Sequence, residues 1–74
     1  MIKRNENNYY VVDEGDNVAN VFADTDWDEN GKYIPNGGEE GYDFSDYEDQ
    51  IVCVTTSFEK ACEIQEKISY GEWQ

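Results

Sequence analysis

The stretch QIVCVTTSFEKACEIQEKISYGEW, residues 50–73, decides the fold, because an apolar run in it is followed at once by a helical pattern. Residues 51–54 are continuously apolar and contain two valines and an isoleucine. Such a run is typical of a strand that is buried on both faces. We therefore predict a strand over residues 51–55, placed at the centre of its sheet.

The second half of the stretch predicts one amphipathic helix over residues 57–70. Thr56 or Ser57 can cap its first turn, and Thr56 and Glu59 have the spacing of a capping box. Gly71 follows the last turn, where glycine commonly ends a helix. The expected apolar stripe consists of Phe58, Ala61, Cys62, Ile64 and Ile68.

Residues 9–23 predict a β-hairpin. Tyr9–Val12 is aromatic and β-branched, as strands commonly are, and residues 18–23 supply the return strand. Between the two runs, Gly15 and Asn17 tolerate the positive φ angles that a tight hairpin turn requires.

The middle of the chain, residues 24–50, is polar and reads as a long acidic excursion. Residues 32–34 suit a short third strand, and a single helical turn over residues 46–49 competes with a solvated loop. The segments together predict one domain over residues 1–74 of the α+β class. In it, a small antiparallel sheet, made of the N-terminal hairpin and the central strand, is packed by one C-terminal helix.

Charge is the dominant property of the chain: eighteen Asp and Glu against five Lys and Arg leave a net charge of −13. Residues 13–49 hold thirteen of the acids and a single base, Lys32. Repulsion among so many like charges destabilises a fold, and the excess negative charge favours binding to a cationic partner. The six Tyr, three Phe and two Trp nevertheless indicate a folded protein, because disordered acidic chains are poor in aromatic residues.

The composition argues against an enzyme and against a bound cofactor. The chain has no histidine, the side chain used most for proton transfer near neutral pH. Cys53 and Cys62 have no basic neighbour in sequence and make a poor zinc site, so we expect both to be reduced and buried. No stretch resembles a signal peptide or a membrane span of about 20 apolar residues, which predicts a cytoplasmic protein.

The segment DTDWDENGKY, residues 24–33, leaves three interpretations open. As an EF-hand-like calcium loop, its ligands would be Asp26, Asp28 and Asn30. Gly37 stands, however, where such a loop needs a bidentate Glu. A turn at Asn30–Gly31 is the interpretation that we favour, so no metal site is predicted. In the third interpretation the acids belong to a surface for a basic partner.

Carboxylates two residues apart on a strand repeat every ~7 Å, about the distance between phosphates along a DNA backbone. Asp24, Asp26 and Asp28 would form such a row if the strand continued. A basic surface that grips nucleic acid can bind such an array, and interleaved aromatic side chains would anchor it. The chain is itself too acidic to bind nucleic acid directly. The candidate partner-binding residues are Asp13, Asp16, Asp24, Asp26, Trp27, Asp28, Glu29, Glu39, Glu40, Tyr42, Asp43, Phe44, Asp46, Tyr47, Glu48 and Asp49.

In size, charge, absence of histidine and α+β build, the chain resembles the small acidic anti-defence proteins of bacteriophages, which block restriction, CRISPR or other nucleic-acid enzymes by mimicking DNA. The resemblance rests on composition and includes no sequence motif. It implies an inhibitor of a basic, nucleic-acid-binding protein. The alternative is a protein-interaction module without mimicry, and exposed sheet edges or Trp73 would allow a dimer.

Overall fold

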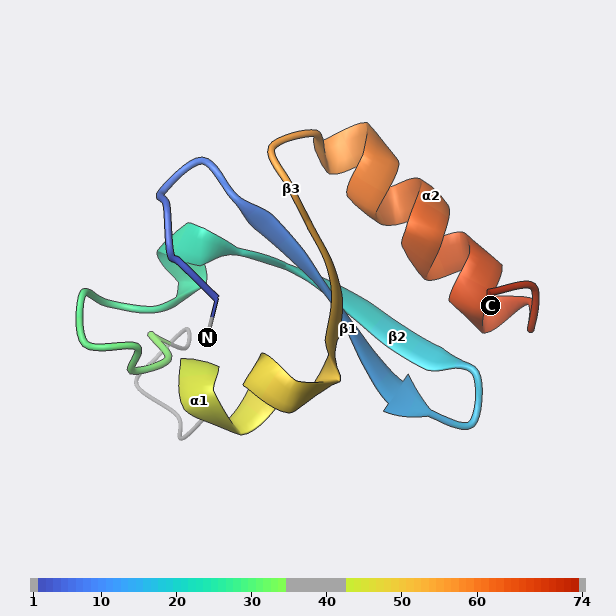
Figure 1. Cartoon of the computed structure of the whole chain (residues 1–74), viewed down its shortest axis with the longest axis horizontal. Helices are drawn as coiled ribbons and strands as arrows, with labels where there is room; N and C mark the ends of the chain where they lie inside the picture. The colour runs from blue at the N-terminus through green and yellow to red at the C-terminus, as the bar shows by residue number, and fades with distance from the viewer. Residues whose placement is uncertain (1, 35–42, 74) are drawn as a thin grey trace.

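The computed structural model describes residues 2–34 and 43–73 and has the α+β fold that the sequence predicts. The elements are β1 (Tyr9–Gly15), β2 (Val18–Ala23), the 3-10 turn η1 (Asp24–Asp26), α1 (Phe44–Tyr47), the 3-10 turn η3 (Glu48–Gln50), β3 (Ile51–Thr55) and α2 (Phe58–Ser69). The strands form one antiparallel sheet in the order β2-β1-β3, and α2 packs on one of its faces (Figure 1).

The central strand is β1, so the central position predicted for β3 is wrong. Tyr10, Val11 and Val12 of β1 are fully buried. Val52 and Val54 of β3 are 39% and 43% exposed. The apolar runs of β1 and β3 look alike in the sequence, and only their strand pairing distinguishes them. β1 pairs with β2 on one side, through the hairpin, and with β3 on the other, so β1 is central and β3 is an edge strand.

The predicted hairpin is confirmed, and its turn is made by two residues with positive φ angles. Asp16 and Asn17 have φ angles of 54° and 63°, as a two-residue type I′ turn requires. Gly15 has a φ of 87° beside an irregularity in the register between Asp13 and Gly15. The Asp13 carboxylate accepts a hydrogen bond from the Gly15 N–H at 3.0 Å and so holds the strand end in place.

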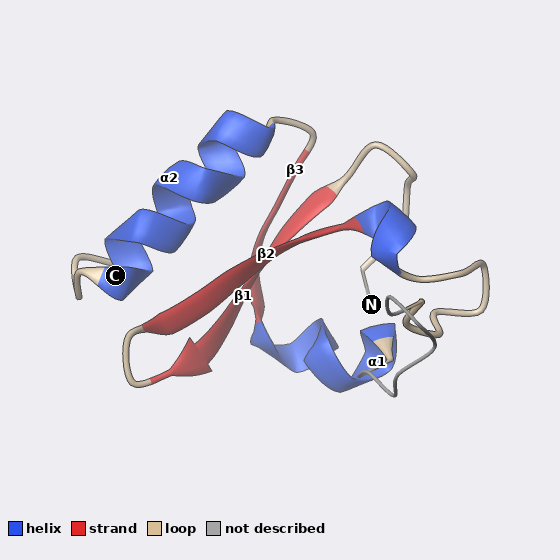
Figure 2. Cartoon of the chain, turned by 180° about the vertical axis from the view of Figure 1, so that it is seen from behind, coloured by secondary structure: helices blue, strands red, loops and turns tan. Residues whose placement is uncertain are grey.

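Both faces of the sheet are covered, each by its own core. The core under α2 consists of Val11, Ala19, Ala61, Ile64 and Ile68. The aromatic core on the opposite face consists of Tyr10, Trp27 and Phe44. Successive side chains of a strand point to opposite faces, so the neighbours Tyr10 and Val11 belong to different cores. Figure 2 shows α2 and α1 on opposite sides of the sheet.

α2 begins at Phe58 and is capped by Ser57, one of the two caps that the sequence allows. The Ser57 Oγ accepts a hydrogen bond from the Lys60 N–H at 3.1 Å, which satisfies one of the first backbone donors of the helix. The helix ends at Ser69, and Gly71 follows with a φ of 73°, as predicted for a helix stop.

Three side chains are less buried than predicted. Phe58 is 56% exposed, and its ring centroid lies 5.3 Å from that of Tyr9 at the rim of the sheet. Cys53 and Cys62 are free thiols that are half-buried. The greater exposure follows from the edge position of β3. A neighbouring strand covers β3 and the adjoining start of α2 on one side only.

Between β2 and β3 the predicted short third strand is reduced to one isolated bridge, Trp27 to Tyr33. α1 begins two residues before the helical turn that was predicted, because Asp43 precedes it as the cap. The Asp46 carboxylate accepts a hydrogen bond from the Asp43 N–H at 3.0 Å. The predicted partner residues Glu39, Glu40 and Tyr42 lie outside the described residues.

Gly15→Ala should lower the free energy of unfolding by about 1 kcal/mol, because a Cβ disfavours the left-handed conformation at this position. No heavy atom lies within 4 Å of the site of the new Cβ, so packing does not contribute. Asn17→Gly keeps the left-handed angle accessible and should be nearly neutral. Urea unfolding followed by circular dichroism measures both variants, and equal stabilities would contradict this account of the turn.

Candidate partner-binding surface

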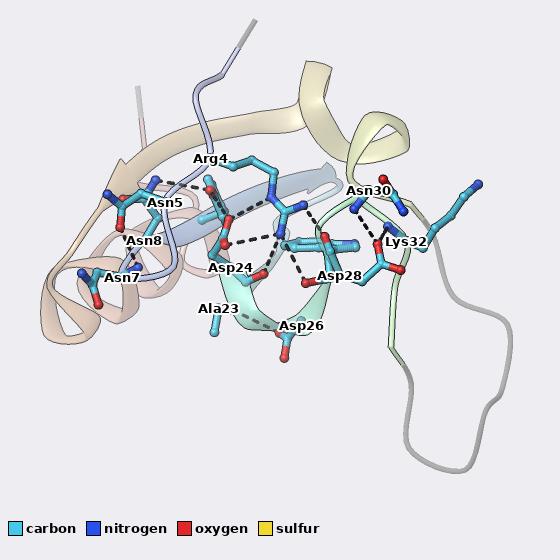
Figure 3. Close-up of polar contacts among 12 residues, drawn as sticks. Arg4, Asn5, Asn7, Asn8, Ala23, Asp24, Asp26, Asp28, Asn30 and Lys32 are labelled. Carbon is cyan, nitrogen blue, oxygen red and sulfur yellow. Dashed lines mark hydrogen bonds and ion pairs between the residues drawn. The ribbon is translucent and has the colours of Figure 1, made fainter.

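Arg4, the only arginine in the chain, holds the turn that follows β2. Its Nε donates to Asp24 Oδ1 and its Nη2 to the Asp24 carbonyl, both at 3.0 Å. Its Nη1 donates to the Asp28 carbonyl at 2.6 Å, and the guanidinium carbon lies 5.3 Å from the centre of the Phe44 ring. Figure 3 shows the guanidinium between Asp24 and Asp28. One side chain therefore ties the turn to the aromatic core.

Asp24 is an internal counter-ion and not the partner contact that was predicted. It is 6% exposed, and its Oδ1 accepts a hydrogen bond from the Tyr10 hydroxyl at 2.7 Å as well as from Arg4. The hydrogen bond to Asp24 raises the pKa of Arg4. Burial raises the pKa of Tyr10, and the neighbouring Asp24 adds to that rise. A buried carboxylate needs such partners, because an unpaired charge is costly away from water.

Arg4→Lys should lower the free energy of unfolding by about 2 kcal/mol, because one ammonium cannot reach the several acceptors that the guanidinium fork joins. The exposed neighbour supplies a charge-matched control: Lys3→Arg exchanges the same two residue types and should have no effect. Urea unfolding of both variants decides the matter. Wild-type stability of Arg4→Lys would contradict the role given to the fork.

The raised pKa of Tyr10 gives stability a dependence on alkaline pH. Below a pH of about 10 both the folded and the unfolded chain keep this phenolic proton, so the contribution of Tyr10 to the free energy of unfolding is fully present and does not change with pH. Above it the unfolded chain loses the proton first, so the free energy of unfolding falls as the pH rises towards the pKa of folded Tyr10.

Urea titrations at a pH of about 9 and of about 11 measure this decline. It should be smaller in Tyr10→Phe than in Tyr70→Phe, because Tyr70 is 75% exposed and lies outside the network. An equal decline in the two variants would contradict the assignment to Tyr10.

Asp28 closes the turn that the sequence favoured for residues 30–31. Its Oδ1 accepts hydrogen bonds from the N–H groups of Asn30 and Lys32, at 2.8 and 2.9 Å. Gly31 has a φ of 79°, which favours glycine. The Asp28 carboxylate is thus used by the backbone of its own loop.

The predicted row of carboxylates at Asp24, Asp26 and Asp28 does not form. The chain leaves the strand at Ala23 and turns into η1, so the alternation of a strand is lost. The Asp26 Oδ2 accepts a hydrogen bond from the Ala23 N–H at 3.1 Å. The three acids therefore face the backbone or Arg4, and local hydrogen bonding has replaced the charge array.

The calcium ligands considered for this segment, Asp26, Asp28 and Asn30, do not converge. Asp26 and Asp28 bind the N–H groups of different residues, and the Asn30 N–H is itself bound to Asp28. Among residues 2–34 and 43–73, no group of three or more acids or cysteines is arranged to hold a metal ion.

Trp27 and Phe44 are core residues, which contradicts the prediction that they contact a partner. They are 3% and 6% exposed, with ring centroids 5.3 Å apart and planes nearly perpendicular. Tyr47 is half-buried, and its ring lies 5.0 Å from that of Phe22. Since α2 covers only one face of the sheet, the aromatic residues of the acidic segment cover the other.

Two further acids of the predicted set are engaged within the chain. Asp43 binds Lys32 Nζ at 2.9 Å, and this hydrogen bond raises the pKa of the exposed lysine. Glu48 accepts a hydrogen bond from the Ile2 N–H at 2.8 Å and so holds the N-terminal segment beside η3. Both carboxylates are half-buried.

The exposed acids of the predicted set in the described ranges are Asp16, Glu29, Asp46 and Asp49. An open hollow of about 420 Å³ joins the hairpin end to the segment α1–η3. Its lining consists of Glu14, Asp46, Tyr47 and Gln50. We call the exposed acids of the hairpin end and of the segment α1–η3, Glu14, Asp16, Asp46 and Asp49, the acidic surface. Asp16 lines a separate hollow, beside Gly71 and Trp73. Glu29 stands apart, beside the Arg4 network.

Arg4 is the residue of this region that sequence reasoning missed. A single arginine in a chain of net charge −13 is a signal for a structural ion pair. Its partner could not be chosen among eighteen acids, because Asp24 is twenty positions away and the intervening hairpin brings the two together.

Comparison of the chain with known protein families, curated proteins and solved structures found no match. Fold and surface together define a small acidic α+β protein with exposed carboxylates at the hairpin end and along α1–η3, and with others on and after α2. None of the described helices is long and apolar enough to cross a membrane.

Proposed function

We propose that this protein binds, without catalysis, the basic nucleic-acid-binding surface of a target protein and occupies it in place of DNA. The observation that supports this proposal is the division among the acids. Asp24, Asp26 and Asp28 are used internally, while Asp16, Asp46 and Asp49 stay exposed in a chain of net charge −13. The exposed acids are available to Lys and Arg side chains.

Long-range attraction would bring the partners together. A strongly acidic protein is drawn to the Lys- and Arg-rich surfaces that proteins use to bind phosphate backbones. This attraction raises the association rate more than it lengthens the life of the complex. Contact at the hollow would lengthen the life of the complex. An Arg or Lys side chain that binds there would lie between Glu14 and Asp46, beside Tyr47.

The class of target follows from this chemistry. A surface that evolved to release counterions on binding DNA or RNA is the kind of surface that a compact polyanion blocks. Restriction, CRISPR and other nucleic-acid enzymes present such surfaces, so an anti-defence inhibitor acting in the cytoplasm is the form of the proposal that we favour.

The triple variant Asp16→Asn, Asp46→Asn, Asp49→Asn should bind its target at least about tenfold more weakly, because three exposed charges at the interface are lost. Asn keeps an acceptor at position 46 for the Asp43 N–H and suits the left-handed angle at position 16. The control Glu59→Gln, Glu66→Gln, Glu72→Gln makes the same change in net charge at exposed sites on and after α2.

The assay is capture from a bacterial lysate on the immobilised protein, washed with EDTA and eluted with a NaCl gradient. The expected result is a nucleic-acid-binding protein that leaves at high salt and that duplex DNA displaces. Capture that is indifferent to salt would favour an interaction module without mimicry. Loss at the EDTA wash would favour a metal-dependent contact. Equal weakening by both triple variants would refute the acidic surface as the binding site.

A further inference from the structure

In the part of the chain that the structure describes, β3 has an open outer edge. It pairs with β1 on one side only. Alternate residues of an edge strand direct their N–H and C=O groups away from the sheet, where another strand can bind them. Within the described residues, the hydrogen bond at its end, from the Ser57 N–H to Thr55 Oγ1 at 3.1 Å, uses a side chain and leaves the strand backbone open.

The opposite edge of the sheet, β2, is protected. The Gln65 Nε2 of α2 donates to the Ala19 carbonyl at 3.1 Å, and Asp26 accepts from the Ala23 N–H. These bonds occupy backbone groups near both ends of β2. The helix therefore contacts the β2 side of the sheet. The two edges differ because backbone groups of β2 that a further strand would need are already hydrogen-bonded.

The β3 edge is also the least charged part of the chain. Residues 50–58 contain no charged side chain, the longest such run in the sequence. Val52 and Val54 expose 39% and 43% of their surface along it. Edge strands are commonly protected by lysine, proline or inward-pointing charges, and none of these occurs between Ile51 and Thr55.

We propose that β3 pairs with β3 of a second copy of this chain. A two-fold axis perpendicular to the sheet makes this pairing antiparallel and joins two three-stranded sheets into one of six strands. Both copies of α2 then lie on the same face. The exposed Val54 meets its counterpart across the new ladder, where cross-strand apolar pairs stabilise a sheet.

Charge favours a second copy over a basic partner as the occupant of this edge. Two molecules of charge −13 repel each other least where neither carries charge, and β3 is such a site. A basic target gains no attraction there. The register irregularity between Val11 and Val12 shortens the usable ladder to about Cys53–Thr55, so the dimer is weak.

The salt dependence of this dimer has the opposite sign to that of partner binding. Added salt screens the repulsion between the two acidic copies, so dimerisation should strengthen from about 0.05 M to about 0.5 M NaCl. Attraction to a basic target weakens over the same range. The two interactions are therefore separable, and the dimer does not rest on the proposed function.

The test compares Val54→Lys with Val18→Lys by sedimentation velocity over a range of concentrations. Both valines are exposed strand residues, at 43% and 50%, and both changes add the same charge, but Val18 lies on β2. The wild type and Val18→Lys should approach twice the 8.6 kDa of one chain at high concentration and high salt. Val54→Lys should raise the Kd at least about tenfold. Circular dichroism verifies that both variants fold.

Amide hydrogen exchange locates the contact: protection of residues 52–55 should rise with protein concentration, and that of β2 should not. A wild type that stays monomeric at millimolar concentration and high salt would overturn the proposal and leave the edge to an extended segment of another protein. Equal loss of dimer in the two lysine variants, or a dimer without protection of β3, would also overturn it.

Discussion

The ion pair between Arg4 and Asp24 is the interaction on which the second half of the structure depends. It joins the N-terminal segment to the turn after β2, and the same carboxylate binds Tyr10 of the central strand. Through the Asp28 carbonyl and the Phe44 ring, the guanidinium reaches the loop and the aromatic core as well. A protein with this excess of acid thus places its one arginine where it fixes the path of the most acidic segment.

A sheet of three strands buries little apolar surface, so covering both faces is a condition for its stability. α2 covers one face with aliphatic side chains, in the manner of an ordinary α+β protein. Among residues 2–34 and 43–73 no long helix covers the other face, and rings projecting from short turns take its place. The aromatic residues among the acids are explained by this need. Their burial also moves the candidate recognition surface from rings to exposed carboxylates.

The sequence predicts the local elements well and their mutual placement less well. The hairpin and α2 carry their own signals, in the turn residues around Gly15 and in the cap and stop of the helix. The position of β3 depends on which of two similar apolar runs pairs on both sides, and neither run encodes that alone. The same limit applies to Asp24 and Asp28, whose hydrogen bonds depend on the path that the chain takes after β2.

The acids accordingly divide by geometry and not by residue type. Those next to a backbone turn serve the fold, because an Asp side chain readily accepts N–H groups of nearby residues. Asp16, Asp46 and Asp49 stay exposed, and of these Asp46 also accepts a hydrogen bond from the Asp43 N–H. A chain can therefore be extremely acidic while only part of its charge is available for recognition, and total charge overstates the surface that a partner meets.

The bonds that close the loop around Gly31 have a consequence for the design of tagged or extended forms of the protein. The Ile34 N–H binds the Asp26 carbonyl and the Phe44 N–H binds the Gly31 carbonyl, each at 2.8 Å, while Lys32 binds Asp43. The chain is thus clamped on both sides of the segment 35–42. A peptide inserted between these clamps should therefore leave both cores in register.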